Sequence, residues 1–208
     1  MKKNSNRYFY HAIKRVFDFF SSLILFIILL PLFFAISIAI KIDSKGPILF
    51  KHKRIGYKGK TIYLYKFRSM VNNAEDLIKS FTPEQAKEWK ENYKLEKDPR
   101  ITKVGAFLRK TSLDELPQLL NIIGGSLSVV GPRPVIKDEL EKYGDDKEKF
   151  LSVKPGLTGY WACHGRSNTT YEERMEMELY YIDNASFRLD LKIIFGTIFS
   201  VLKRDGAR

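Results

Sequence analysis

The longest apolar segment of the chain covers residues 16–40, and Asp18 is the only charged residue in it. Its length exceeds the roughly 20 residues that an α-helix needs to cross the hydrocarbon core of a bilayer. The segment is too long for the apolar region of a signal peptide, and it lacks the small-residue cleavage site of one. The pattern therefore predicts a helix that is retained and lies in a membrane.

Basic residues flank this segment on both sides, which is typical of segments that stay in the cytoplasm. A helix that simply spans the membrane would export one of the two clusters. A helix that enters one leaflet and returns keeps both clusters inside, where they can meet anionic head groups. The pattern favours this re-entrant helix, with its break at Pro31, over a spanning anchor with a tolerated proline. The flanking residues are Lys2, Lys3, Arg7, Lys14 and Arg15 before the segment and Lys41, Lys45, Lys51, Lys53 and Arg54 after it.

The remaining pattern predicts short elements. Apolar and polar residues alternate within residues 43–70 around a glycine-rich turn at 57–60, which indicates a β-hairpin. Residues 70–98 have a helical pattern, with Thr82 and Gln85 at capping-box spacing. A helix is also expected over 172–184, and the second apolar-rich segment, 187–201, can lie flat on a bilayer as an interfacial helix. The expected fold is a small membrane-associated α+β domain, with a basic N-terminus and re-entrant membrane helix (1–41), a cytoplasmic-face catalytic domain (42–208), a β-hairpin and several amphipathic interfacial helices.

Charge and cysteine content narrow the function classes. Of the 208 residues, 36 are Lys or Arg and 24 are Asp or Glu, which gives a net charge of +12 and calls for an anionic partner. One cysteine and three histidines exclude a disulfide framework and a structural zinc site, so a reducing compartment is expected. The sequence contains neither a P-loop nor a GxGxxG fingerprint, which counts against P-loop NTPases and Rossmann enzymes.

The densest candidate chemistry lies in residues 98–134. Ser112 and Glu115 have capping-box spacing, so a helix is expected to begin there, with Asp114 and Glu115 in its first turn. Free amides and the positive end of the helix dipole at such a place stabilise carboxylates and phosphates. Arg109 and Lys110 add positive charge just upstream. The alternative is structural, because capping alone accounts for Glu115 and Asp114 is a common first-turn acid.

Two further segments carry candidate binding residues. Prolines on both sides of Arg133 restrict the backbone, and a guanidinium held in this way suits phosphate, although the segment can also be a rigid surface turn. Residues 154–166 are expected to form a loop that could hold a nucleotide, with Trp161 available for stacking. Cys163 is expected to be inert, because the side chain of the adjacent His164 does not naturally face it, and His164 is expected to be packed or hydrogen-bonded.

Several blocks along the chain resemble the bacterial sugar transferase family, the monotopic polyprenyl-phosphate hexose-1-phosphate transferases. The blocks occur in the family's order and span nearly the whole chain. The resemblance implies that this chain holds the family's catalytic core with its one membrane element, whereas larger members carry further segments. They are the basic-flanked apolar segment, YKFRSM at 65–70, DPRITKVGAFLRKTSLDELPQLLNIIGG at 98–125, SVVGPRP at 128–134, and VKPGLTGYW with HGR within 153–166.

The resemblance implies a reaction and its residues. Asp114 matches the nucleophile that would attack a UDP-hexose, release UMP and hold the sugar phosphate until polyprenyl (undecaprenyl) phosphate accepts it. Glu115, together with Asp114, would lie at a Mg²⁺ ion. Arg109 and Arg133 match phosphate-binding positions. Weaker candidates are Arg68 for phosphate and Lys66, Trp161 and Arg166 for the nucleotide sugar.

The resemblance also implies a setting. It places the chain in the bacterial inner membrane with the active site on the cytoplasmic face, among anionic lipids, in exopolysaccharide, lipopolysaccharide or capsule assembly and without nucleic acid as a partner. A homo-oligomer is compatible with it, and residues 160–182 favour glucose or galactose over acetamido sugars. Two other functions remain open from the residues alone, a membrane-bound nucleotide-sugar pyrophosphohydrolase and a basic membrane-tethered binding module.

Overall fold

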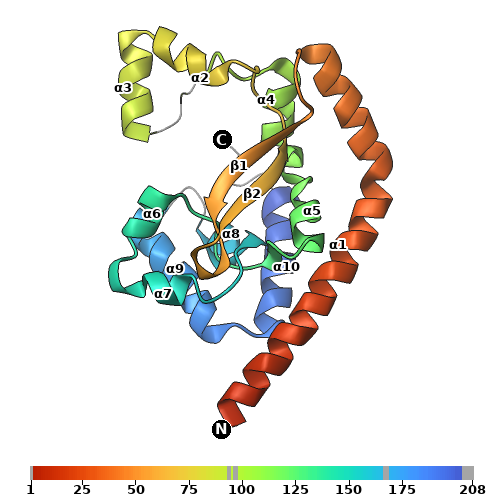
Figure 1. Cartoon of the computed structure of the whole chain (residues 1–208), viewed down its shortest axis with the longest axis vertical. Helices are drawn as coiled ribbons and strands as arrows, with labels where there is room; N and C mark the ends of the chain where they lie inside the picture. Colours follow the sequence, from red (N-terminus) through yellow and green to blue (C-terminus); the bar gives the residue numbers. More distant parts are fainter. Residues whose placement is uncertain (1, 93–94, 96–97, 166–168, 203–208) are drawn as a thin grey trace.

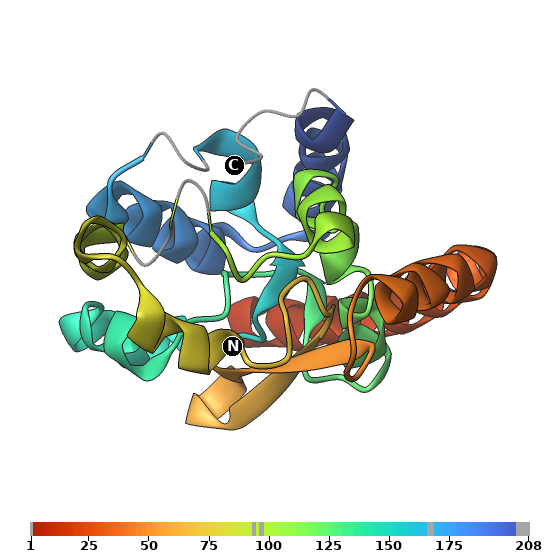
Figure 2. The same cartoon turned by 90° about the horizontal axis from the view of Figure 1, so that it is seen from above.

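The computed structural model describes residues 2–92, 95, 98–165 and 169–202. A long helix, α1 (Lys2–Asp43), forms one side of the molecule, and a short arm made of α2 (Ala74–Leu77), a 3₁₀ turn (Ile78–Ser80) and α3 (Pro83–Asn92) lies on the opposite side (Figures 1 and 2). Most of the remaining elements lie beside α1 and below the arm in the view of Figure 1. This mixture of helices with two small sheets confirms the predicted combination of helices with a β-hairpin.

The helix α1 is continuous and contains Pro31, although it changes direction along its length (Figure 1). The structure therefore has a bent helix where the sequence predicted a break. A proline removes only one backbone hydrogen bond, and packing can hold a helix together on both sides of it. Ile36 and Ile40, one turn apart after the proline, are buried against Phe67 and Leu108 of the neighbouring elements. Most other apolar residues of α1 stay exposed, as a lipid-facing helix requires, and residues 9–43 have the length and hydropathy to cross a membrane.

The predicted hairpin is confirmed. Strand β1 (Leu49–Ile55) pairs antiparallel with β2 (Thr61–Phe67), with Leu49 opposite Phe67 and Ile55 opposite Thr61. The turn between them (Tyr57–Gly59) places Lys58 and Gly59 at positive φ, which the glycine tolerates without steric cost. This turn directs β2 back toward the centre of the molecule.

The capping box predicted before α3 is also confirmed. The backbone N–H of Gln85 donates to Thr82 Oγ1 over 3.3 Å, and the backbone N–H of Thr82 donates to Gln85 Oε1 over 3.1 Å. The arm returns to the body of the protein at Arg100, whose guanidinium binds the Asp98 carboxylate with two hydrogen bonds and lies 4.2 Å from the Trp89 ring centre. The helical pattern over 70–98 thus forms two short helices in place of one.

The helix predicted to begin at Ser112 begins later. Helix α4 (Lys103–Lys110) ends at Thr111, and Ser112 is in the left-handed region at φ 56°, with no side-chain cap hydrogen bond. A 3₁₀ turn (Leu113–Glu115) and Pro117 separate it from helix α5 (Gln118–Ile123). The left-handed residue lies just past the end of α4, and such a residue cannot adopt the extended backbone that an N-cap needs.

The C-terminal part surrounds a small parallel sheet. Strand β3 (Ser128–Val130) pairs with β4 (Gly156–Thr158), and Val129 and Val130 of β3 belong to a buried apolar cluster of this part of the protein. Helix α8 (Tyr160–His164) follows β4, so the segment expected to be a loop contains a strand and a helix. The other elements are α6 (Lys137–Glu141), a 3₁₀ turn (Gly144–Asp146), α7 (Lys147–Phe150), α9 (Tyr171–Asn184) and α10 (Phe187–Leu202), of which the last two were predicted.

Candidate active site

The two adjacent acids lie in the 3₁₀ turn between α4 and α5, next to the end of β2. Lys66 of β2 places its Nζ 2.5 Å from Glu115 Oε1 and 4.0 Å from Asp114 Oδ2. Glu115 is half-exposed, whereas only 9% of Asp114 is accessible to solvent. The structure therefore joins Lys66, which the sequence offered only as a weaker candidate, to the acidic pair of Asp114 and Glu115.

The side chain of Asn121 fixes this arrangement. Its Oδ1 accepts a hydrogen bond from the Tyr65 N–H over 2.9 Å, and its Nδ2 donates to the Tyr63 carbonyl over 2.8 Å. An amide that binds two backbone groups of β2 holds this strand beside α5 in a single register. Lys66 follows Tyr65 directly, so it is held at the acidic pair. Sequence reasoning missed Asn121, although a buried amide in an otherwise apolar helix is a usable signal.

Burial dominates the electrostatics of Asp114 and raises the pKa of its carboxyl group above the ordinary value. The positive charges of Lys66 and Arg109 act in the opposite direction, and the negative charge of Glu115 adds to the effect of burial. A carboxylate that is poorly solvated and flanked by cations is less stabilised by water than one at the surface. It is therefore suited to act as a nucleophile toward an anionic group that the same cations attract.

Arg109 approaches the acids from the end of α4. Its Nε donates to Ser69 Oγ over 2.9 Å, and the Asp114 charge partly offsets the lowering of its pKa by burial. Gly105 allows this contact, because a Cβ at this position would lie 2.0 Å from the Ser69 carbonyl oxygen. Arg109 is thus placed near the acids as the sequence predicted, and Ser69, which orients it, was missed.

Arg68 does not face this site, which corrects its assignment to a substrate phosphate. Its Nη1 donates to the Lys45 carbonyl over 2.7 Å, and its Nη2 donates to the Ser44 carbonyl over 2.7 Å. Gly46 passes so close that a Cβ would lie 2.0 Å from Arg68 Nη1. Because these nitrogen atoms are used by carbonyls at the end of α1, Arg68 anchors that helix.

The second group of predicted binding residues lies around β3, α8 and α9. The exposed Arg133 side chain has its Cζ 5.5 Å from the Trp161 ring centre, and Trp161 Nε1 donates to Thr169 Oγ1 over 2.8 Å. Arg166 lies outside the described residues. Lys66 of the acidic site and Arg133 of this second group both act on His52. Burial, together with the charges of Arg54, Lys66 and Arg133, lowers the pKa of His52 to about 4. This region therefore attracts anions.

Cys163 and His164 do face each other, contrary to the prediction. Cys163 Sγ lies 3.0 Å from His164 Nδ1, and the His164 ring stacks on Tyr160 with 4.0 Å between the ring centres. A short helix, in which adjacent side chains can both reach back to the same carbonyl, allows this contact. Both side chains bind the Tyr160 carbonyl oxygen, so the expected hydrogen-bonded role of His164 is confirmed.

Glu178 of α9 lies beneath the Arg133 turn. Its Oε1 accepts the Arg133 N–H over 3.0 Å, and only 1% of the residue is exposed. Burial raises the pKa of Glu178 from 4.5 to about 7, against the opposing effects of the Arg133 N–H and the Arg174 charge. This acid thus holds the segment that carries Arg133.

The raised pKa of Glu178 predicts a pH-dependent stability. Between pH 4.5 and about 7 the folded protein retains a proton that the unfolded chain has lost, so the free energy of unfolding falls as the pH rises through this window. The loss should be on the order of 3 kcal/mol. Glu178→Gln keeps an oxygen for the Arg133 N–H and should remove this decline. Unfolding measured at pH 5 and pH 8, with the exposed Glu176→Gln as control, checks it. An equal decline in both variants would contradict the assignment.

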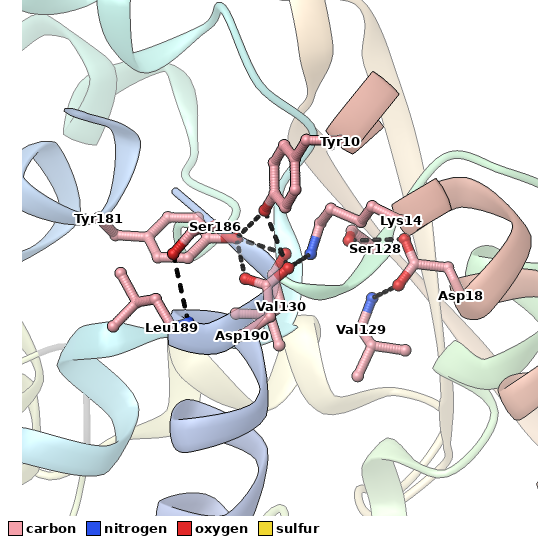
Figure 3. Close-up of polar contacts among 10 residues, drawn as sticks. All are labelled: Tyr10, Lys14, Asp18, Ser128, Val129, Val130, Tyr181, Ser186, Leu189 and Asp190. Atoms are coloured by element: carbon pink, nitrogen blue, oxygen red, sulfur yellow. Dashed lines mark hydrogen bonds and ion pairs between the residues drawn. The ribbon is translucent and has the colours of Figure 1, made fainter. Parts of the chain in front are cut away.

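Polar contacts fasten the first half of α1 to the rest of the protein (Figure 3). Asp18, which the sequence presented only as an isolated charge in an apolar helix, accepts hydrogen bonds from Ser128 Oγ over 2.7 Å and from the Val129 N–H over 3.1 Å. Asp190 of α10 accepts hydrogen bonds from Tyr10, Lys14 and Tyr181 at 2.6 to 2.8 Å.

The other end of α1 is fastened to the same domain. Asp43 Oδ2 accepts the Val104 N–H at the start of α4 over 3.0 Å, and Arg68 binds the carbonyls that follow. The domain therefore binds polar groups of α1 near both ends of its apolar segment, 16–40.

An acidic pair set against a lysine and an arginine is suited to phosphate chemistry, and the same chain carries one exposed helix that is long and apolar enough to cross a membrane. Comparison with known proteins identifies the family. Residues 9–204 match the model of the bacterial sugar transferases, and the chain belongs to this family.

Relatives in this family carry specific names. The chain is 43% identical, over its whole length, to the undecaprenyl-phosphate galactose phosphotransferase of Salmonella typhimurium, and equally similar to the UDP-galactose-lipid carrier transferase of Erwinia amylovora. It spans 43% of the length of each of them. It is also 44% identical to the exopolysaccharide production protein ExoY of Sinorhizobium fredii, over 93% of this chain and 87% of that protein.

Proposed function

We propose that this protein transfers a hexose 1-phosphate from a UDP-hexose to polyprenyl phosphate, as the first membrane step of exopolysaccharide or related glycan assembly. The observation that carries the proposal is the buried Asp114 next to Glu115, with Lys66 and Arg109 beside them. Arg109, Asp114 and Glu115 lie within the segment 98–125, and Lys66 lies within the segment 65–70, and both segments carry the family resemblance. Family membership supports the same reaction class.

The reaction proceeds in two balanced steps. In the first, an oxygen of the Asp114 carboxylate attacks the β-phosphorus of the UDP-hexose, and the bond from that phosphorus to the bridging oxygen breaks. UMP leaves with the electron pair, and the hexose phosphate remains on Asp114 as an acyl phosphate. In the second step, an oxygen of polyprenyl phosphate attacks the same phosphorus, and the Asp114 carboxylate leaves. Lys66 and Arg109 attract the phosphates and offset the negative charge of the attacking carboxylate.

The residues at the site fit Mg²⁺. This ion usually binds through one or two carboxylates together with substrate phosphates and water, and Glu115 and Asp114 offer such a pair. In the structure the Lys66 ammonium lies beside these carboxylates, and this ion pair supports the proposal that the acids can face a cation. Among the described residues no group of three or more His, Cys, Asp and Glu side chains could hold a metal. When bound, Mg²⁺ supplies charge neutralisation on the diphosphate.

The attachment of α1 supports a monotopic placement in the inner membrane, with the active site on the cytoplasmic face. Asp18 and Asp43, near the two ends of the apolar segment, bind the same domain. A helix that crossed a bilayer would hold its ends on opposite sides, about 30 Å of hydrocarbon apart. The bend in α1 (Figure 1) and the basic flanks agree with a helix that enters one leaflet and returns.

The names of two relatives make UDP-galactose the first donor to test, in agreement with the sequence preference for glucose or galactose. The test is UMP release by detergent-purified protein with Mg²⁺ and a panel of UDP-sugars, with and without undecaprenyl phosphate. The proposal predicts release that depends on the lipid for one or two donors. Sustained release without lipid would identify a pyrophosphohydrolase, and no release with any donor would favour the binding module.

Arg133 provides a separate prediction. Arg133→Ala removes an exposed guanidinium from a turn that its backbone N–H holds to Glu178, so the fold should stay intact. Reaction with the UDP-sugar should fall by about 10-fold or more, because a charged hydrogen bond to phosphate contributes about 1.5–3 kcal/mol. Steady-state kinetics with Lys137→Ala, an exposed basic residue nearby in sequence, as control measure it. Unchanged kinetics in Arg133→Ala would remove Arg133 from the binding site.

A further inference from the structure

An apolar groove runs between the second half of α1 and α4. It has a volume of about 450 Å³, within the range of small-molecule sites. Ala35 and Ala39, one turn apart on α1, form one wall, and Val104 and Phe107 contribute to the other. Among the described residues that line it, Lys103 alone carries a charge.

The groove borders the lipid-facing side of α1. Phe34, Ile38 and Ile42, spaced one turn apart, form the neighbouring stripe of the helix, and 45–81% of each residue is exposed. On α4, Phe107 is 60% exposed. An open apolar surface that continues from a membrane helix is suited to a hydrocarbon chain.

The groove adjoins the candidate active site, because Leu113, in the turn that carries Asp114, packs against the cluster that contains the groove residues Ile36 and Leu108. Lys103, Phe107 and Lys110 lie at positions i, i+4 and i+7 of α4, so both lysines are on the side of Phe107. Helix α4 ends at Lys110, and the polypeptide continues through Ser112 into the turn that carries Asp114. A lipid whose hydrocarbon tail lies in the groove therefore meets the basic side chains of α4, which are close in sequence to Asp114. This favours an anionic head group over a neutral one.

We propose that this groove binds the isoprenoid chain of the polyprenyl phosphate acceptor and directs its phosphate along the basic side of α4. The inference rests on the proposed function and adds a binding place for its second substrate. A dissolved nucleotide sugar has no need of an apolar groove, so changes in the groove should affect the two half-reactions differently.

Ala39→Phe fills the groove, and Ile38→Phe places the same side chain on the adjacent exposed stripe as the matched control. The KM for polyprenyl phosphate should rise at least tenfold in Ala39→Phe, whereas labelling of the protein by radioactive UDP-galactose without acceptor should stay at the wild-type level. Ile38→Phe should behave as the wild type in both assays. Equal KM values in the two variants would overturn the proposal.

A second measurement does not depend on turnover. A photoreactive polyprenyl phosphate analogue, added to wild-type protein in phosphatidylethanolamine vesicles, should label residues 35–39 and 103–108. Excess polyprenyl phosphate should suppress this labelling, and equal phosphatidylglycerol should not. Labelling elsewhere, equal suppression by phosphatidylglycerol, or cross-links between two copies at Phe107 would overturn the proposal. Groove labelling without reaction of any donor would instead contradict the proposed function alone.

Discussion

Asp114→Asn should abolish turnover, with a loss of at least about 10³-fold in the release of UMP, and should remove covalent capture of the hexose phosphate. An amide has nearly the shape of the carboxylate but cannot form the acyl phosphate. The variant should be as stable as the wild type or more stable, because burial disfavours the charged form of Asp114. Lys66 keeps its ion pair with Glu115 at 2.5 Å. The loss would therefore report on chemistry and leave the fold unchanged.

The measurement combines UMP release with mass spectrometry of protein incubated with UDP-galactose and Mg²⁺ in the absence of lipid. Wild-type protein should gain the mass of one hexose phosphate on the peptide that contains Asp114. Asp138→Asn, which changes an exposed first-turn acid of α6, is the control and should retain both signals. Near-normal turnover of Asp114→Asn would exclude the nucleophile assignment, and capture of the sugar phosphate on another residue would move it.

Among the variants proposed for this protein, Asp190→Ala should produce the largest fall in the free energy of unfolding. The Asp190 carboxylate accepts hydrogen bonds from Tyr10, Lys14 and Tyr181, and 5% of its side chain is exposed (Figure 3). Its removal leaves the Lys14 ammonium, itself 13% exposed, without its ion-pair partner. Breaking one partner of a buried pair costs about 3–5 kcal/mol. The contact between α1 and α10 should loosen with it.

Two further variants make this prediction sharp. Lys14→Met combined with Asp190→Ala should be more stable than Asp190→Ala alone, because no unpaired charge stays buried. Asp183→Ala breaks an ion pair with Lys149 in which both side chains are more than a third exposed, and this change should cost at most about 1 kcal/mol. Urea unfolding in detergent compares all of them. A loss in Asp190→Ala no larger than in Asp183→Ala would show that this network does not hold α1.

Local signals in the sequence were sufficient for several elements. Alternation and glycines predicted the hairpin, and Thr82 and Gln85 predicted the start of α3. Periodicity predicted α9, and an apolar-rich segment indicated α10. Each of these depends on residues a few positions apart, so the chain around them decides little. The motif of acids and arginines also placed Arg109, Asp114 and Glu115 in one short segment, and covalent proximity keeps these residues close together in the structure.

Distant contacts decided what the sequence left open. Ser112 has the residue type and spacing of an N-cap, yet the end of α4 places it at φ 56°. Arg68 resembles a phosphate ligand until the chain folds its guanidinium onto the end of α1, 23 residues earlier. Lys66 and Glu115 are 49 positions apart, and Asp18 and Val129 are 111 apart.

The sequence by itself thus determined the membrane helix, the family resemblance and the acidic pair, since these are written in contiguous residues. Only the tertiary structure decided that Lys66 joins the acids, that Arg68 binds the carbonyls that follow α1, and that one domain holds α1 near both ends of its apolar segment. The physical reason is that a hydrogen bond or an ion pair acts over about 3 Å in space, and nothing in the local sequence states which distant residue will lie within that distance.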